Sequence, residues 1–240
     1  MSTARFFQKM VLSASAFIVL GLAASSVRAD QVFVANTNIS GTGQVSAQAT
    51  FHQGGGNLLQ ITLKNLQSTS NVGQGISGIQ FQIYDSNGNV FNVTGSITAQ
   101  NNSLIRVGGG GSVTSLGTSP TGWGLSNNGP SFTLTALGFT GNGTNPPDEL
   151  ILGSLNDPNG SIAGNSPHNP FINQTGVFSL TLSSNLPAGF QIRNVVVLFG
   201  TRPDSVGAAV PEPATMLLFG TGLIGLASRL RKRRARTAGE

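Results

Sequence analysis

The chain of 240 residues contains no cysteine. This excludes a disulfide scaffold, a thiol nucleophile and any metal site built on cysteine thiolates. Charged residues make up only 9% of the chain, against about 25% in ordinary globular domains. Aromatic residues are also few, with one tryptophan and one tyrosine. Asn, Gln, Ser, Thr and Gly must therefore cover most of the surface of any folded domain.

The basic residues lie mainly at the two ends of the chain. Of 13 Lys and Arg, three precede residue 30 and six follow residue 228. The segment 30–209 has four basic and six acidic residues, a net charge of −2. Binding to nucleic acid needs a basic patch that follows the phosphates. We therefore expect no nucleic-acid partner, and we assign the terminal positive charge to membrane topology.

The first 29 residues have the pattern of a secretory signal peptide. Arg5 and Lys9 precede an uncharged apolar stretch at 10–24, and the segment ends in the small residue Ala29. This pattern predicts cleavage by signal peptidase between Ala29 and Asp30. The alternative is an uncleaved anchor, although the apolar stretch is short for a membrane span.

The C-terminus carries three consecutive features. Pro211, Glu212 and Pro213 are followed by a largely apolar segment at 214–228 and then by a basic cluster. The cluster consists of Arg229, Arg231, Lys232, Arg233, Arg234 and Arg236. As a helix the apolar segment would rise by about 22 Å, and snorkelling arginines with local thinning can fit it to the bilayer. The pattern predicts a transmembrane helix with the cluster in the cytoplasm and the main domain across the membrane.

The triplet favours an extended strip at the outer membrane face. Each residue that precedes a proline is disfavoured in a helix, whereas Pro213 itself suits the first helical position. Glu212 then lies at a helix N-terminus, where the dipole favours negative charge. Such a stiff, extended strip has the shape that a protease cleft accepts.

These features, in this order, resemble the PEP-CTERM sorting signal of Gram-negative bacteria that make exopolysaccharide. The resemblance covers residues 211–236 only. It implies that an exosortase, a membrane-embedded cysteine-type transpeptidase, recognises the tail and cuts near Pro211, Glu212 and Pro213. The protein would be held transiently in the inner membrane, with its main domain periplasmic, and would then reach the cell surface or extracellular matrix. The alternative is an ordinary single-pass tail anchor.

Between the two ends, apolar and polar residues alternate in short runs. Alternation of this kind predicts strands with one buried and one hydrated face. The runs lie at 31–35, 45–51, 59–64, 79–84, 91–98, 132–136 and 178–182, and a continuous apolar run lies at 195–199. The fold expected for 30–200 is all-β, an antiparallel β-sandwich of which a jelly roll is one form. Residues 112–130 and 140–175 are expected to be irregular, and 201–210 a spacer.

Candidate chemical groups are few, and none forms a recognised site. His52 and His168 have no partners at metal-ligand spacing, so both are expected to be ordinary surface histidines. Asp85 begins a sequence that weakly resembles a calcium loop. A hairpin turn is the better interpretation, because a residue other than glycine occupies the position where such a loop needs glycine. Asp148 and Glu149 are adjacent and would point to opposite sides of an extended chain, so they give no facing pair for glycoside hydrolysis.

Two further patterns have both structural and functional interpretations. Trp123, Phe139 and Phe171 could stack on sugar rings if exposed, but burial in the core is the default expectation for aromatic residues. The glycines at 73, 75 and 78 match a dinucleotide-binding spacing, but they precede a predicted strand instead of opening a helix.

The sequence therefore predicts an exported, non-catalytic cell-surface or matrix protein without cofactor or metal. The alternative is a carbohydrate-binding or adhesive module with exopolysaccharide as its partner. An enzyme is the least favoured class, because the sequence offers no convergent set of catalytic groups.

Overall fold

The computed structural model describes residues 30–97, 101–128, 130–137, 148–201 and 207–209. In these ranges the chain forms β-strands and short 3₁₀ turns, with no α-helix. The prediction of an all-β domain is confirmed. The predicted signal peptide and transmembrane helix lie outside the described residues.

The strands follow one another closely along the chain. They are β1 (Gln31–Ile39), β2 (Gly43–Gly55), β3 (Leu58–Asn65), β4 (Ile76–Tyr84), β5 (Gly95–Ile97), β6 (Asn101–Val107), β7 (Val113–Pro120), β8 (Gly124–Asn128), β9 (Ser131–Thr135), β10 (Ile151–Leu152), β11 (Phe171–Asn173), β12 (Thr175–Leu182), β13 (Gln191–Phe199) and β14 (Gly207–Ala209). The 3₁₀ turns are η1 (Val72–Gln74), η2 (Gly109–Gly111) and η3 (Ser166–His168).

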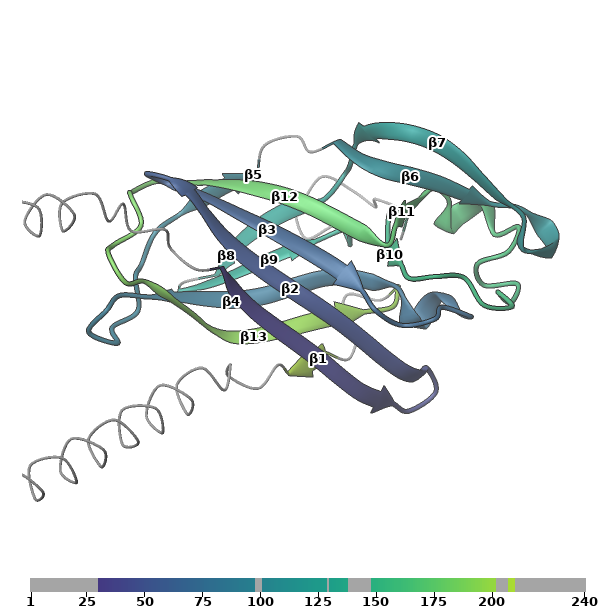
Figure 1. The fold of residues 1–240 in the computed structure, drawn as a ribbon, viewed down its shortest axis with the longest axis horizontal. Helices are drawn as coiled ribbons and strands as arrows, with labels where there is room; N and C mark the ends of the chain where they lie inside the picture. The colour runs from purple at the N-terminus through teal and green to yellow at the C-terminus, as the bar shows by residue number, and fades with distance from the viewer. Residues whose placement is uncertain (1–29, 98–100, 129, 138–147, 202–206, 210–240) are drawn as a thin grey trace, which may run out of the picture.

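The strands form two sheets that face each other (Figure 1). The first sheet has the order β1-β2-β3-β12-β5. The second has the order β14-β13-β4-β10-β11-β6-β7, with β9 pairing to β4 and β8 pairing to β9. The ladders between these strands are antiparallel, apart from that of β10 with β11. The first sheet is a meander extended by two later strands, which is not the Greek-key order of a jelly roll.

Alternating apolar side chains build the core between the sheets. In β2 every second residue from Val45 to Phe51 is buried, as the alternation predicts. Phe51 of the first sheet meets Phe81 of the second with ring centroids 5.0 Å apart, and Phe81 stacks on Phe132 at 5.2 Å. These aromatic contacts join the two layers into one sandwich.

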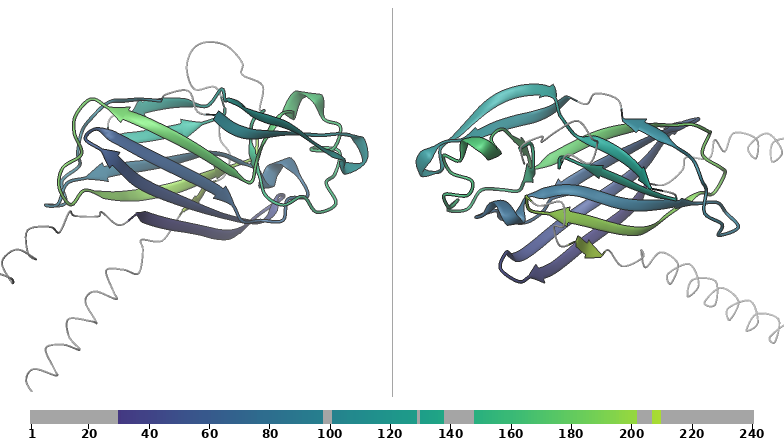
Figure 2. Two further views of the ribbon diagram at one scale, coloured as in Figure 1. Left: turned by 45° about the horizontal axis from the view of Figure 1, so that its top comes forward. Right: turned by 180° about the vertical axis from the view of Figure 1, so that it is seen from behind.

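A second, smaller apolar cluster lies at one end of the sandwich. There the long hairpin of β6 and β7 extends past the main sheets and packs with β10, β11 and the loop before η3 (Figures 1 and 2). The cluster consists of Ile105, Val107, Leu150, Leu152, Ile162 and Phe171. The domain therefore has a main core and an end cap.

Four sequence predictions need correction. Residues 140–175, predicted to be irregular, contain β10 and β11. Residues 112–130 are not irregular, because they contain β7 and β8; β7 is rich in Ser, Thr and Gly and is exposed on both faces, so it has no apolar alternation to detect. Of the strand predicted at 91–98, the described residues form only β5. It pairs with β12 in the first sheet, whereas the preceding strand β4 lies in the second. Residues 207–209, predicted as spacer, form β14.

One glycine marks a close approach of two backbones. A Cβ atom at Gly153 would lie 1.8 Å from the carbonyl oxygen of Gln67, and the Gly153 N–H donates to the Thr69 hydroxyl at 2.9 Å. We expect Gly153→Ala to destabilise the domain by about 1–3 kcal/mol, since the segment must move to make room. Urea unfolding of residues 30–209 measures this. Gly124→Ala is the control, because a Cβ there meets nothing within 4 Å. Equal stability of the two variants would contradict the expectation.

Candidate functional site

The predicted C-terminal sorting signal follows β14 in the sequence. This strand pairs antiparallel with β13, and its register places Ala209 opposite Val196 and Gly207 opposite Leu198. Pro211, Glu212 and Pro213, the apolar segment 214–228 and the basic cluster from Arg229 lie outside the described residues. The structure therefore fixes where the segment leaves the domain, at one edge of the second sheet.

β13, the strand with which β14 pairs, is part of the second sheet of the sandwich. On its other side β13 pairs with β4 from Gln191 to Phe199, with a bulge between Arg193 and Val196. Val195, Val197 and Phe199 are buried in the main core. The described chain thus ends in a strand, β14, that is paired with a strand of the core.

The N-terminal end of the described chain is also tied into the fold. The exposed Asp30, which the sequence predicts as the first residue after signal cleavage, pairs through its carboxylate with His52 Nδ1 at 2.7 Å. Gln31 then bridges to the second sheet, donating to the Phe190 carbonyl at 3.3 Å and accepting from the Ile192 N–H at 2.8 Å. The described chain begins at Asp30, and Ala29, on the other side of the predicted cleavage point, lies outside the described residues.

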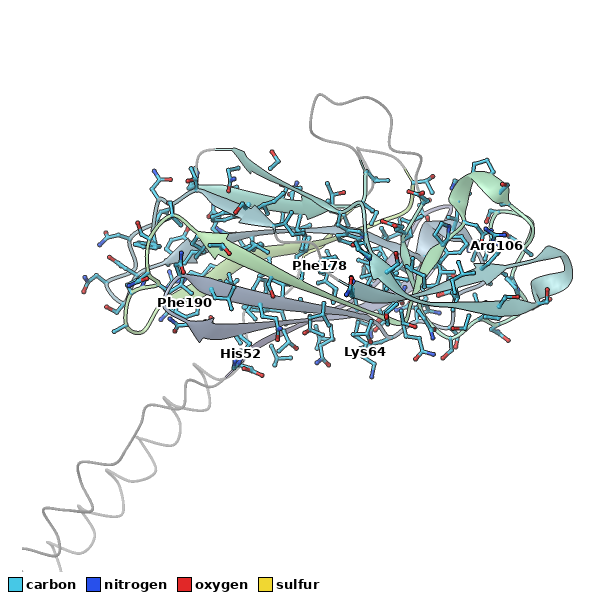
Figure 3. All side chains as sticks on the ribbon, turned by 90° about the horizontal axis from the view of Figure 1, so that it is seen from above. His52, Lys64, Arg106, Phe178 and Phe190 are labelled. Carbon is cyan, nitrogen blue, oxygen red and sulfur yellow. The ribbon has the colours of Figure 1, made fainter. Side chains whose placement is uncertain are left out.

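His52 is a surface residue, as predicted, but it has a partner that the sequence did not reveal. Its side chain and that of Asp30 are 50% and 48% exposed (Figure 3). A pair this exposed contributes only about 0–1 kcal/mol to stability. Pairing in the β1–β2 ladder brings the two residues together across the chain, a proximity that spacing alone does not indicate.

Asp148 and Glu149 precede β10, and Glu149 contacts the loop between β7 and β8 that carries the single tryptophan of the chain, Trp123. Glu149 has a left-handed backbone, with φ at 56°. Its carboxylate accepts a hydrogen bond from the Gly122 N–H, and its carbonyl accepts from Trp123 Nε1 at 3.0 Å. The Trp123 ring in turn lies 4.5 Å from that of Phe178 in the core. Glu149 therefore anchors the loop that carries Trp123.

Partial burial raises the pKa of both carboxyls. It raises the pKa of Asp148, an effect that nearby His168 opposes. Burial likewise raises the pKa of Glu149; the Gly122 N–H lowers it, and the neighbouring charge of Asp148 raises it further. The ionised forms are thus disfavoured in the folded state, so both carboxyls contribute more stability below their unfolded pKa values than at neutral pH.

We expect Glu149→Gln to stabilise the domain at pH 7. The amide keeps an oxygen that can accept from Gly122 and removes the half-buried charge. The gain should shrink as pH falls towards 4.5, where wild-type Glu149 takes up its proton before the unfolded chain does. Thermal unfolding of residues 30–209 at several pH values checks this. The exposed Asp157→Asn is the control, and a gain that does not depend on pH would contradict the account.

The Asp85 segment is a hairpin turn, as predicted. One carboxylate oxygen accepts from the N–H groups of Asn87 at 2.9 Å and Asn89 at 2.8 Å, and these donors lower the pKa of Asp85. The Phe91 N–H then bonds to the Ile83 carbonyl and closes the hairpin. The Asp85 carboxylate is thus engaged in the turn.

Across the described residues, no group of three or more His, Asp or Glu side chains could hold a metal ion.

Two of the three candidate stacking aromatics are buried. Trp123 is 4% exposed and Phe171 is fully buried, which confirms the core interpretation for both; Phe139 lies outside the described residues. Gly73 lies in η1, Gly75 directly follows it and Gly78 lies within β4, so these glycines lead into a strand, as predicted, and do not open an α-helix.

The described basic residues are few and dispersed. Lys64 lies on β3 and Arg106 on β6, at separate places on the surface (Figure 3). Arg193 lies over the Tyr84 ring, with the guanidinium carbon 4.8 Å from its centroid. No helix among the described residues is long and apolar enough to span a membrane, and the predicted span at 214–228 falls outside them.

The fold and its exit point define a class: an all-β domain whose chain continues, from a sheet edge, into a separate C-terminal signal. A family model of the PEP-CTERM protein-sorting motif matches residues 209–234. The chain therefore carries a PEP-CTERM protein-sorting motif in its C-terminal segment. The motif implies export, passage through the membrane and processing by an exosortase. Searches of curated proteins and of solved structures each found no match.

Proposed function

We propose that this chain is a non-catalytic protein of the cell surface or extracellular matrix. A signal peptidase would remove residues 1–29, and the inner membrane would hold the tail until an exosortase cleaves it near Pro211, Glu212 and Pro213. The β-sandwich would then be delivered to the exterior. The observation that carries the proposal is the sorting motif at 209–234, placed directly after a folded all-β domain.

The surface chemistry of the domain supports this role. Between residues 30 and 209 the sequence is nearly uncharged for its length, with four basic and six acidic residues. The hairpin strand β7 exposes Ser, Thr and Gly on both faces. Such a surface is hydrated without strong charge and suits a polysaccharide-rich envelope. The sugar-stacking alternative is weakened, because Trp123 and Phe171 are buried.

Fractionation of an exopolysaccharide-producing Gram-negative host tests the proposal. The full chain should appear outside the cell without its tail, and the same strain without its exosortase should retain the full-length chain in the membrane. Deleting 229–236 should reduce processing, because the helix then lacks the charges that stop its transfer. Deleting 237–240 is the matched control. Release that is unchanged without the exosortase would contradict the proposal.

A further inference from the structure

The outer face of the second sheet carries polar side chains across three adjacent strands. β13, β4 and β9 pair in that order, and the second sheet lies in front when the domain is seen from behind (Figure 2). Most of the inward side chains of these strands are apolar and lie in the main core. The outward side chains, in register from strand to strand, include Tyr84, Gln82, Gln80, Arg193, Ser131 and Thr133. We call this surface the outer polar face.

Arg193 is the one charged residue of these three strands. Its guanidinium carbon lies 4.8 Å from the centroid of the Tyr84 ring, and its Nε and Nη2 atoms both donate to the side-chain oxygen of Gln191. These contacts use one plane and one edge of the guanidinium. Among the described residues, no acceptor meets the other edge, between Nη1 and Nη2, and no carboxylate pairs with this arginine. The cation is therefore held in place without being neutralised.

A β-bulge brings a second polar side chain to the same face. Consecutive residues of a regular strand point to opposite faces, but the β13 ladder shifts register between Arg193 and Val196. Asn194, in the shifted part, has a left-handed backbone with φ at 52°. Its amide donates to Gln82 Oε1 at 2.6 Å and to the Tyr84 hydroxyl at 3.3 Å. Arg193 and Asn194 thus lie on one face, and bulges elsewhere direct side chains in this way next to active sites.

Hydrogen bonds also fix the amide side chains of the outer polar face. Gln82 accepts from Asn194 and from the Tyr84 hydroxyl, the latter at 3.0 Å, and it donates to the Ser131 hydroxyl at 2.9 Å. This network joins β13, β4 and β9. Because these side chains are already held, a ligand that binds here has few of them to immobilise, which lowers the entropic cost of binding. Amides and hydroxyls both donate and accept hydrogen bonds, so the face matches a ligand rich in hydroxyl groups.

We infer that the outer polar face binds a polysaccharide that carries carboxylate groups, and that Arg193 receives the carboxylate. A guanidinium edge binds a carboxylate through two parallel hydrogen bonds, and the edge between Nη1 and Nη2 is open to one. The hydroxyls of the sugar chain then lie on the amides and hydroxyls of β4 and β9. This partner rests on the proposed function, which brings the domain to the exterior. It needs no stacking on Trp123 or Phe171, which are buried.

The charge of the face favours this ligand over a densely charged polymer. A nucleic acid needs several basic contacts along its phosphates, and the outer polar face supplies one. The three strands contain no Asp or Glu that would repel an acidic ligand. One cation among neutral amides therefore complements isolated acid groups on a chain that is otherwise hydroxylated.

Binding of acidic polysaccharides to residues 30–209 tests this inference. This segment contains all the named strands, and it excludes the basic cluster of the tail, which would attract a polyanion by itself. The probes are polygalacturonate, polymannuronate and hyaluronate. Fully methyl-esterified polygalacturonate controls for the carboxylate, and polyglutamate controls for the sugar. The measurement is the Kd by calorimetry at about 0.15 M salt, where weak surface attraction is screened.

We expect the wild type to bind at least one of the three acidic polysaccharides, and Arg193→Gln to weaken that binding about tenfold or more, because a hydrogen-bonded charge is lost. Arg193→Lys should also bind more weakly, since an ammonium lacks the planar fork. Arg106→Gln is the matched control: it removes the same charge from β6, outside the outer polar face, and should bind as the wild type does. Thermal unfolding of each variant shows that it is folded.

The possible results separate this inference from the proposed function. Binding to none of the three polysaccharides, or equal binding by the wild type and Arg193→Gln, would overturn the inference. Equal binding of the methyl ester or of polyglutamate would also overturn it, because the carboxylate or the sugar would then not be recognised. If Arg193→Gln unfolds at a lower temperature, Arg193→Lys, which keeps the charge, decides in its place. Each of these results leaves the sorting route intact, since that route is tested by cleavage of the tail.

Discussion

Replacing Glu212 with alanine is expected to leave most of the protein uncut and bound to the membrane. The substitution removes the one negative charge in the triplet, at the position where the predicted transmembrane helix begins. The flanking prolines keep the chain extended, so the change isolates the effect of charge. Because Glu212 lies beyond β14, the sandwich should fold as in the wild type. The measurement is the ratio of cleaved to full-length chain in fractionated cells.

Two companion variants give this prediction its controls. Glu212→Asp keeps the charge and should retain more processing than Glu212→Ala. Glu240→Ala removes a carboxylate beyond the basic cluster and should be processed normally. If Glu212→Ala were cut as fast as the wild type, the triplet would not be the recognised feature, and the segment would serve only as an anchor.

The largest loss of stability is expected from Phe81→Ala. Phe81 is 1% exposed and lies between Phe51 and Phe132, so it joins the two sheets. Truncating a buried phenylalanine removes its transfer free energy and leaves a cavity, at a cost of about 3–5 kcal/mol. This is a large part of the ~5–15 kcal/mol that stabilises a typical domain. Urea unfolding of residues 30–209 measures the loss of stability.

An exposed residue provides the comparison for this core variant. Val113 of β7 is 53% exposed, and Val113→Ala should change the free energy of unfolding by less than about 0.5 kcal/mol. A small effect at Phe81 would mean that the two sheets do not share the core described above. The contrast between the two variants therefore tests the sandwich arrangement.

The sequence predicted most of the strands that have one face in the core, but it missed β6, in which the two consecutive buried residues Leu104 and Ile105 break the alternation. Apolar alternation around Phe51, Phe81 and Phe178 reports burial directly, because side chains on a strand point to opposite faces in turn. The strands that it missed lack this signal. β7 is exposed on both faces, and β10 and β11 are too short to alternate. The partner sheet of each strand also escaped prediction, since pairing depends on contacts far apart in the chain.

Of the candidate site, the sequence revealed the linear motif but not the contacts that depend on the fold. Pro211, Glu212, Pro213 and the basic cluster form a linear signal whose meaning lies in the order of residues, so the sequence alone revealed it. The Asp30–His52 pair, the Glu149 anchor of Trp123 and the pairing of β14 are tertiary features. Each joins segments that spacing does not connect, and each needed the fold to become visible.

On the proposed route the tail is removed during export while the β-sandwich is delivered intact. Intact mass of the protein released from an exosortase-bearing host tests it most directly. The account predicts a chain that begins at Asp30 and lacks residues 214–240. A released chain that retains 214–240 would contradict it.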